Sequence, residues 1–196
     1  MLATAAAEPA TLVIGIDANA ASMVEASRRA AGPARKGGLA NAMFVLAAAE
    51  APPEELRALA ARVTVLFPWG SLLRGCLGAD AVVAEGIAAL LAPAGALELL
   101  VAPADRDGLD GLPTDPDAVI AAATTTFEGA GLRLLEAWTA TDPEVRASGS
   151  TWARRLLSNP TSRRRVLAMR FTAEGVTMTG RSAMVGGTRS MDGSRS

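Results

Sequence analysis

Short apolar runs that stop at a polar residue recur along the chain, and most are followed by a segment of helical character. The clearest is VTVLFPWGSLLRGCLG, residues 63–78, in which Val63 to Phe67 suit a strand covered on both faces, as in a parallel sheet. Pro68 has no N–H to donate, so strand pairing must end there. Further strands are expected over residues 11–16, 42–46, 96–101 and 133–139, and helices over 19–29, 79–91 and 118–129. This alternation predicts an α/β fold with a mostly parallel, Rossmann-like sheet, which residues 164–171 close as an antiparallel edge strand.

The composition excludes several kinds of chemistry. The 196 residues contain neither His nor Tyr, which rules out Ser-His-Asp and Cys-His relays and zinc sites of the His/Cys type, so no metal site is expected. A single cysteine, Cys76, excludes an intrachain disulfide framework and fits the reducing cytoplasm. The apolar stretch of residues 81–102 is interrupted by Glu85, Pro93 and Glu98, so we expect no membrane span.

Three residues follow predicted strands at the edge where open α/β sheets bind ligands. Trp69 offers a flat stacking surface there, or else closes the core. Asp17 stands where Rossmann-like folds bind ribose hydroxyls, although it also suits a simple helix cap. Glu50 follows three alanines that leave room for a flat ring. Its carboxylate could accept a hydrogen bond from the exocyclic amine of such a ring. A solvated loop residue is the alternative.

Positive charge is concentrated in the carboxyl-terminal part, although the formal net charge is -1. Ten arginines and three acidic residues follow position 142. A loop over residues 32–41 adds Arg35 and Lys36. A polyanionic partner and a solvated basic face both fit this pattern. Residues 175–196 lack periodicity and are predicted to be a disordered tail behind one domain of residues 1–174.

Five elements together resemble one family closely: GIDANAASM, PARKGGLAN, AAAE, VLFPWGSLLRGCLG and STWARRL. The family is that of the aminoglycoside-resistance methyltransferases, which use S-adenosyl-L-methionine to methylate N1 of adenine 1408 in 16S rRNA. The resemblance covers residues from about 10 to 171. It implies a class I methyltransferase fold and a cytoplasmic monomer that acts on the small ribosomal subunit.

The resemblance also implies roles for individual residues. It places Asp17 on the ribose of the cofactor and Ala49 and Glu50 around its adenine, and it makes Trp69 and Trp152 the two rings that hold the flipped target base. The residues assigned to the cofactor are Asp17, Ala49, Glu50 and Trp69. Those assigned to catalysis are Trp69, Trp152 and Ser150. Those assigned to RNA are Arg35, Lys36, Arg154 and Arg155.

The chain departs from the family pattern at its start. The family opens with a strand and a GxGxG-type turn that hold the cofactor, and Met1 to Pro9 matches only the end of the helix that follows them. We therefore expect a sheet without its first, central strand and glycine-rich loop, from a truncated or wrongly started reading frame. Two alternatives remain open, a catalytically inactive RNA-binding remnant and a small-molecule methyltransferase.

Overall fold

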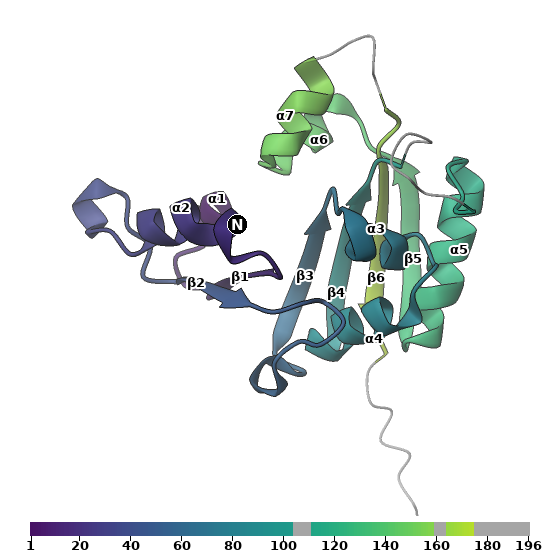
Figure 1. Ribbon diagram of the computed structural model, residues 1–196, viewed down its shortest axis with the longest axis horizontal. Helices are drawn as coiled ribbons and strands as arrows, with labels where there is room; N and C mark the ends of the chain where they lie inside the picture. Colours follow the sequence, from purple (N-terminus) through teal and green to yellow (C-terminus); the bar gives the residue numbers. More distant parts are fainter. Residues whose placement is uncertain (104–110, 159–163, 175–196) are drawn as a thin grey trace, which may run out of the picture.

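The strands form two sheets in the part of the chain that the computed structural model describes, residues 1–103, 111–158 and 164–174. One sheet pairs β1 (Val13–Asp17) in parallel with β2 (Ala42–Leu46). The other has the order β3 (Ala60–Leu66), β4 (Leu91–Val101), β6 (Leu167–Ala173) and β5 (Leu132–Thr139). Figure 1 shows the β1–β2 unit on the β3 side of the larger sheet.

The antiparallel strand is internal, so its predicted position at the sheet edge is wrong. β3 and β4 run parallel, whereas β6 is antiparallel to both of its neighbours and lies between β4 and β5. Leu167, Met169 and Phe171 alternate along β6 and are all buried. An inner strand satisfies this burial better than an edge strand, which leaves β5 as the outer strand.

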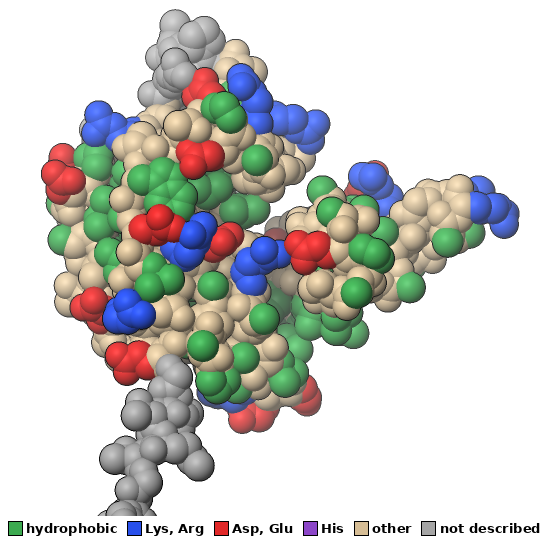
Figure 2. Space-filling view, turned by 180° about the vertical axis from the view of Figure 1, so that it is seen from behind, with side chains coloured by type: hydrophobic (Ala, Val, Ile, Leu, Met, Phe, Trp, Pro, Cys, Tyr) green, Lys and Arg blue, Asp and Glu red, His purple; other side chains and the backbone are tan. Residues whose placement is uncertain are grey.

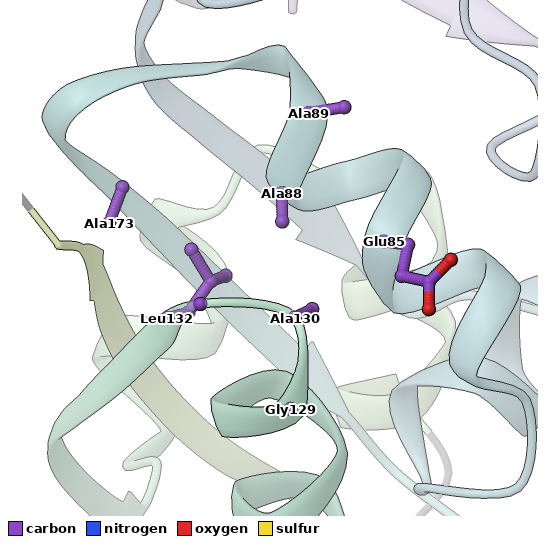
Figure 3. Close-up of a pocket in the computed structure, with 8 residues that line it drawn as sticks. Glu85, Ala88, Ala89, Gly129, Ala130, Leu132 and Ala173 are labelled. Carbon is purple, nitrogen blue, oxygen red and sulfur yellow. The ribbon is translucent and has the colours of Figure 1, made fainter.

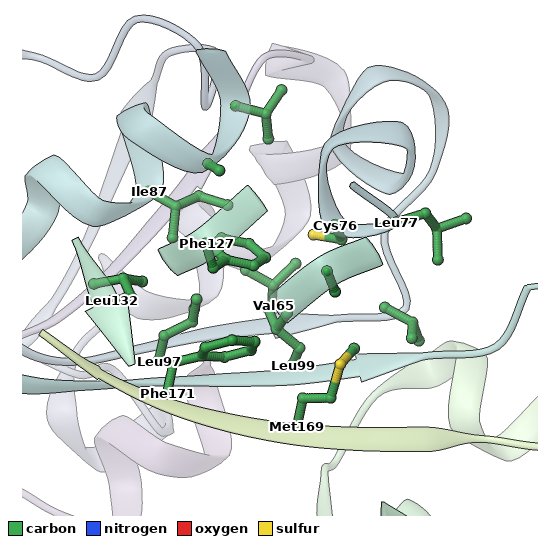
Figure 4. Packing of buried hydrophobic residues seen from close by; sticks show 14 of the residues in the cluster. Val65, Cys76, Leu77, Ile87, Leu97, Leu99, Phe127, Leu132, Met169 and Phe171 are labelled. Atoms are coloured by element: carbon green, nitrogen blue, oxygen red, sulfur yellow. The ribbon is translucent and has the colours of Figure 1, made fainter. Parts of the chain in front are cut away.

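Three helices cover one face of the four-stranded sheet: α3 (Gly70–Cys76), α4 (Ala81–Leu90) and α5 (Pro116–Gly129). Their apolar side chains meet those of β3, β4 and β6 in the main core (Figure 4). Phe127 of α5 and Phe171 of β6 pack with ring centroids 5.0 Å apart. The helices therefore hold β3 and β4, the strands that lead to the carboxyl edge, in a fixed position.

The opposite face of this sheet is polar. Arg170 of β6 forms ion pairs with Glu98 of β4 and Glu136 of β5, and its guanidinium lies 5.7 Å from the ring centroid of Trp138. Figure 2 shows acidic and basic side chains side by side over these strands. Buried and partly exposed residues alternate from Gly95 to Val101 of β4, because only one face of the sheet meets the helices.

The β1–β2 unit carries α1 (Leu2–Ala7), α2 (Ala20–Ala30) and the short helix η1 (Ala34–Lys36). The Nδ2 group of Asn41 donates to three backbone carbonyls, those of Ala5, Glu8 and Thr11, and so fixes the turn from α1 into β1. Asn19 caps α2 by accepting from the N–H of Ala21 at 3.0 Å. A second short helix, η2 (Glu54–Leu56), lies between β2 and β3.

Two further helices follow β5, α6 (Asp142–Ala147) and α7 (Thr151–Ser158). They pack on the carboxyl ends of β3 and β4 through a second apolar cluster that includes Phe67, Val145 and Leu156. The predicted tail of residues 175–196 lies outside the described residues. No helix in the described ranges is long and apolar enough to span a membrane.

Candidate active site at the carboxyl ends of the strands

Trp69 is presented to the surface by a strained turn. The turn runs from Phe67, with φ 52°, to Gly70, with φ 58°, and both values lie in the left-handed region. Two contacts of Phe67 anchor the turn. Its side chain is buried, and its backbone N–H donates a hydrogen bond to the carbonyl of Leu100 at 2.8 Å. Trp69 is 51% exposed. It therefore does not fill the core, and the alternative of a core tryptophan is wrong.

Trp152 reaches the same place from α7. The Ser150 hydroxyl accepts the N–H of Trp152 at 3.2 Å, and the N–H of Ser150 donates to the Ser148 hydroxyl at 3.3 Å. Ser150 therefore caps the first turn of α7 and orients Trp152. The centroids of the Trp69 and Trp152 rings lie 5.0 Å apart at an interplanar angle of 77°, an edge-to-face contact.

The two rings border a hollow of only about 10 Å³, which Phe67, Leu73, Ala102 and Arg164 also line. A base held between two parallel rings needs them about 7 Å apart, twice an ordinary carbon contact. The structure thus brings the predicted pair together, but a base can enter only after one ring has moved. The sequence did not single out Arg164, which donates to the carbonyl of Ala102 at 3.1 Å, because it lies in a run of three arginines.

Asp17 ends β1 and lies three residues before the first residue of α2. Its carboxylate accepts the N–H of Asn19 at 2.8 Å and the hydroxyl of Ser22 at 2.6 Å. These bonds fix the turn from β1 into α2, whose N-cap residue is Asn19, so Asp17 supports the cap and does not itself cap the helix. A carboxylate offers about four acceptor positions, so a further pair is available to the hydroxyls of a ligand.

Ala49 and Glu50 follow β2 at the same edge. Ala49 packs against the main core, and its backbone carbonyl lies so close to α4 that a Cβ atom on Gly86 would stand 1.8 Å from the oxygen. Gly86 therefore positions this loop, a role the sequence hinted at only through a glycine inside a helix. Glu50 is half-buried and has no hydrogen bond or ion pair within the described residues.

The predicted RNA-contacting side chains form two separate groups. Arg154 and Arg155 are exposed on α7, and Arg35 and Lys36 are exposed on η1, beyond α2. None of the four has an ion-pair partner among the residues described. In Figure 1, α7 and the α2 region project from different parts of the molecule. The structure does not join the two groups into one patch.

Two further features lie outside this site. A shallow hollow of about 360 Å³ borders the start of β5 and the end of α5, at the opposite end of the sheet from Trp69 (Figure 3). Alanines and glycines form most of its wall, and it holds none of the predicted site residues. Cys76 is fully buried, and desolvation raises the pKa of its thiol to about 12, which excludes it as a nucleophile at neutral pH.

Comparison of the sequence with known proteins finds rRNA methyltransferases. Residues 1–172 match the NpmA family model, 16S rRNA (adenine(1408)-N(1))-methyltransferase. The enzyme of that name from Streptoalloteichus hindustanus is 35% identical over 159 residues, which cover 77% of this chain and 72% of the relative. An rRNA methyltransferase from Saccharopolyspora hirsuta is 37% identical over 145 residues, covering 68% of this chain and 88% of the relative.

Solved structures agree in fold. The 16S rRNA methyltransferase KamB superposes with a TM-score of 0.78 at 31% identity, over 88% of this chain and 81% of that chain. A variant of the 16S rRNA (adenine(1408)-N(1))-methyltransferase from Catenulisporales acidiphilia, solved with the cosubstrate SAM, gives a TM-score of 0.78 at 30% identity, over 90% of this chain and 81% of that chain. The fold is an α/β methyltransferase fold with a mixed sheet, and the chain belongs to the family of 16S rRNA (adenine(1408)-N(1))-methyltransferases.

Proposed function

We propose that this chain methylates N1 of adenine 1408 in the 16S rRNA of the small ribosomal subunit, with S-adenosyl-L-methionine as methyl donor, and that the reaction confers aminoglycoside resistance. Family membership supports the reaction class and the donor. The observation that carries the proposal is the meeting of two tryptophan rings, Trp69 and Trp152, at the carboxyl edge of the sheet. Paired aromatic faces suit a base taken out of its stack.

The residues at the ends of β1 and β2 fit the cofactor in part. Bound S-adenosyl-L-methionine supplies a sulfonium methyl group. Asp17 retains acceptor positions for ribose hydroxyls, and the Glu50 carboxylate, which has no partner among the described residues, can accept from the exocyclic amine of an adenine. The side chain of Ala49 is small enough to leave room for the adenine ring, and its backbone is held in place against Gly86 of α4.

The chemistry asks little of the protein as an acid or base. N1 of adenine carries a free lone pair, so methyl transfer requires proximity and alignment more than proton removal. A chain without histidine is suited to such a reaction. Trp69 and Trp152 would leave their mutual contact to hold the flipped base, and Ser150 would fix Trp152 through its cap on α7. Stacking contributes about 1 to 3 kcal/mol per base, comparable to the few kcal/mol that flipping costs.

The exposed cations support an RNA substrate over a small molecule. Arg154 and Arg155 stand near the ring pair on α7, and Arg35 and Lys36 lie on η1. Two separate basic groups suit the phosphates of a folded RNA whose shape the protein reads. Because one chain carries both groups, we propose that a monomer docks on the small subunit.

We also propose that residues 1–174 make one class I methyltransferase domain whose sheet has room for a further central strand, followed in such folds by a glycine-rich loop. The support lies in the pairing: β1 and β3 are edge strands within the described residues, although both belong to parallel ladders. Parallel sheets normally keep such strands inside.

Purified small subunits, millimolar S-adenosyl-L-methionine and this protein would test the reaction. Mass spectrometry of the digested RNA should find N1-methyladenine at position 1408, and the Trp152→Ala variant should yield much less product while it still binds the subunit. Product at another nucleotide, or none from the unaltered protein at saturating donor, would refute the proposed reaction.

The second candidate is an RNA-binding protein without methyl transfer. The position of β1 favours it, because β1 carries Asp17 and pairs on one side only within the described residues, so the strand that would support a cofactor site is less firmly held. Salt-sensitive binding to small subunits without any methylated adenine would identify this case.

A further inference from the structure

The hollow of about 360 Å³ at the start of β5 is built almost entirely from small residues. One wall is α4, through Glu85 and two alanines of its last turns, and the other is the turn from α5 into β5, residues 129–132. Ala173, at the end of β6, completes the lining, and Figure 3 shows these elements around the hollow. Apart from Glu85 and the buried Leu132, every lining residue is alanine or glycine, so a long side chain can lie there.

The surroundings of the hollow are electronegative. The carboxyl ends of α4 and α5 both border it, and the last carbonyl groups of a helix carry a partial negative charge. Glu85 adds a full negative charge and has no hydrogen bond or ion pair within the described residues. Arg133 does not neutralise this charge, because alternation along β5 directs its side chain to the opposite face from Leu132. A cationic group on a long stem is therefore the chemistry that the hollow favours.

The chain itself brings a cationic segment to this place. β6 ends in the wall of the hollow at Ala173, and the N–H of Glu174 donates to the carbonyl of Gly131 at 3.3 Å. The segment that follows, residues 175–196, contains three arginines and one aspartate. Its first arginine, Arg181, is seven residues beyond Glu174, a length of chain that spans up to about 24 Å. Arg181 can therefore reach the hollow, at the high effective concentration that a short linker gives.

We propose that the hollow is the docking site of the chain's own carboxyl-terminal segment, residues 175–196, with the Arg181 guanidinium paired to the Glu85 carboxylate. This sequence lacks a helical or strand period, so single side chains are what it can insert. Met178 suits the alanine walls, because its unbranched side chain fills irregular apolar gaps. Docking ties the end of β6 to α4, at the end of the sheet opposite Trp69.

Limited trypsin digestion of the full chain tests this docking, because Arg181 and Arg189 are both followed by serine and are matched cleavage sites. Cleavage after Arg181, relative to that after Arg189, should be about fivefold slower in the unaltered chain than in Glu85→Gln. The matched control is Glu128→Gln, which removes an exposed carboxylate of α5 outside the lining and should leave the ratio unchanged. The same ratio in the unaltered chain and in Glu85→Gln would overturn the proposal.

Carbodiimide cross-linking, which joins an amine to a carboxylate in contact with it, identifies the partner of Arg181. Lys36 is the only lysine of the chain, so Arg181→Lys and Arg189→Lys each add one amine at a chosen position. Mass spectrometry of the digested Arg181→Lys variant should find an amide between residue 181 and Glu85. The Arg189→Lys variant should give much less cross-linking to Glu85.

Two other cross-linking results would refute the proposal. A link between the chains of a dimer would assign the hollow to the segment of a second copy, and links from position 181 to other carboxylates alone would place the segment elsewhere. None of these readouts depends on methyl transfer, so the docking and the proposed reaction can fail separately.

Discussion

At the residue scale, Gly86 determines how closely the loop of Ala49 and Glu50 approaches α4. A Cβ atom at position 86 would meet the Ala49 oxygen at 1.8 Å, a distance that forces backbone to move. Alanine favours a helix by about 1 kcal/mol over glycine, but overpacking of this kind costs about 1 to 3 kcal/mol. Gly86→Ala should therefore lower the free energy of unfolding, measured by urea denaturation.

Gly129 provides the matched control. It also lies in a helix, and a Cβ atom there would meet nothing within 4 Å. Gly129→Ala should be neutral or stabilising by up to about 1 kcal/mol. If both alanine variants have the same stability, the close approach of Ala49 to α4 is not real.

At the element scale, α6 depends on one carboxylate. The Thr141 N–H donates to Glu144 at 2.6 Å and lowers the pKa of that carboxyl below its ordinary value of 4.5, with further help from the Thr141 hydroxyl and the Trp138 indole. Because the folded-state pKa is lowered, the stabilisation is present above the ordinary pKa and is lost as the pH falls through the lower, folded-state value. The helix should therefore loosen in acid.

The protection factor of the Val145 amide, which bonds to the Thr141 carbonyl at 2.9 Å, reports on this cap. Protection should fall as the pH drops below 4.5 in the unaltered protein and should be lower and nearly flat with pH in Glu144→Gln. A variant with the same pH profile as the parent would show that Glu144 does not support α6.

α7 supports a second prediction at this scale. Arg154 and Arg155 are exposed on it, so reversing both to glutamate should weaken binding to small subunits and make its dependence on salt concentration shallower, because fewer counterions are released. Arg133→Glu, an exposed change near the amino end of β5, should alter binding much less. Filter binding at several salt concentrations measures the slopes, and equal slopes for all proteins would contradict the RNA-facing role of α7.

The elements show what a single sequence can predict. The strand 42–46 and the helices near 20–30 and 81–90 were predicted to within about two residues, because each has a clear apolar period and a capping or breaking residue. α6 was not among the predicted helices, since its six residues are too few to show a helical period. The internal place of β6 depends on pairing between distant segments, which local patterns do not encode.

At the scale of the whole molecule, the sequence predicted which aromatic residues meet at the site but not how they are arranged. Trp69 and Trp152 are separated by over eighty residues in the sequence, yet the family resemblance paired them and the structure brings their rings into contact. Their edge-to-face arrangement was not predictable, because it depends on how α7 packs over the turn at Phe67. The importance of Gly86 and Arg164 was equally hidden, since both act through contacts across the fold.

The central claim is that this ring pair holds the target adenine. Four variants test it, Trp69→Phe, Trp69→Leu, Trp152→Phe and Trp152→Leu, in which phenylalanine keeps an aromatic face and leucine keeps only apolar bulk. The measurement is N1 methylation of adenine 1408 in purified small subunits at saturating S-adenosyl-L-methionine, per folded molecule as determined by thermal unfolding. We predict partial activity in the phenylalanine variants and a larger loss in the leucine variants, with subunit binding retained. Full activity per folded molecule in both leucine variants would contradict the account.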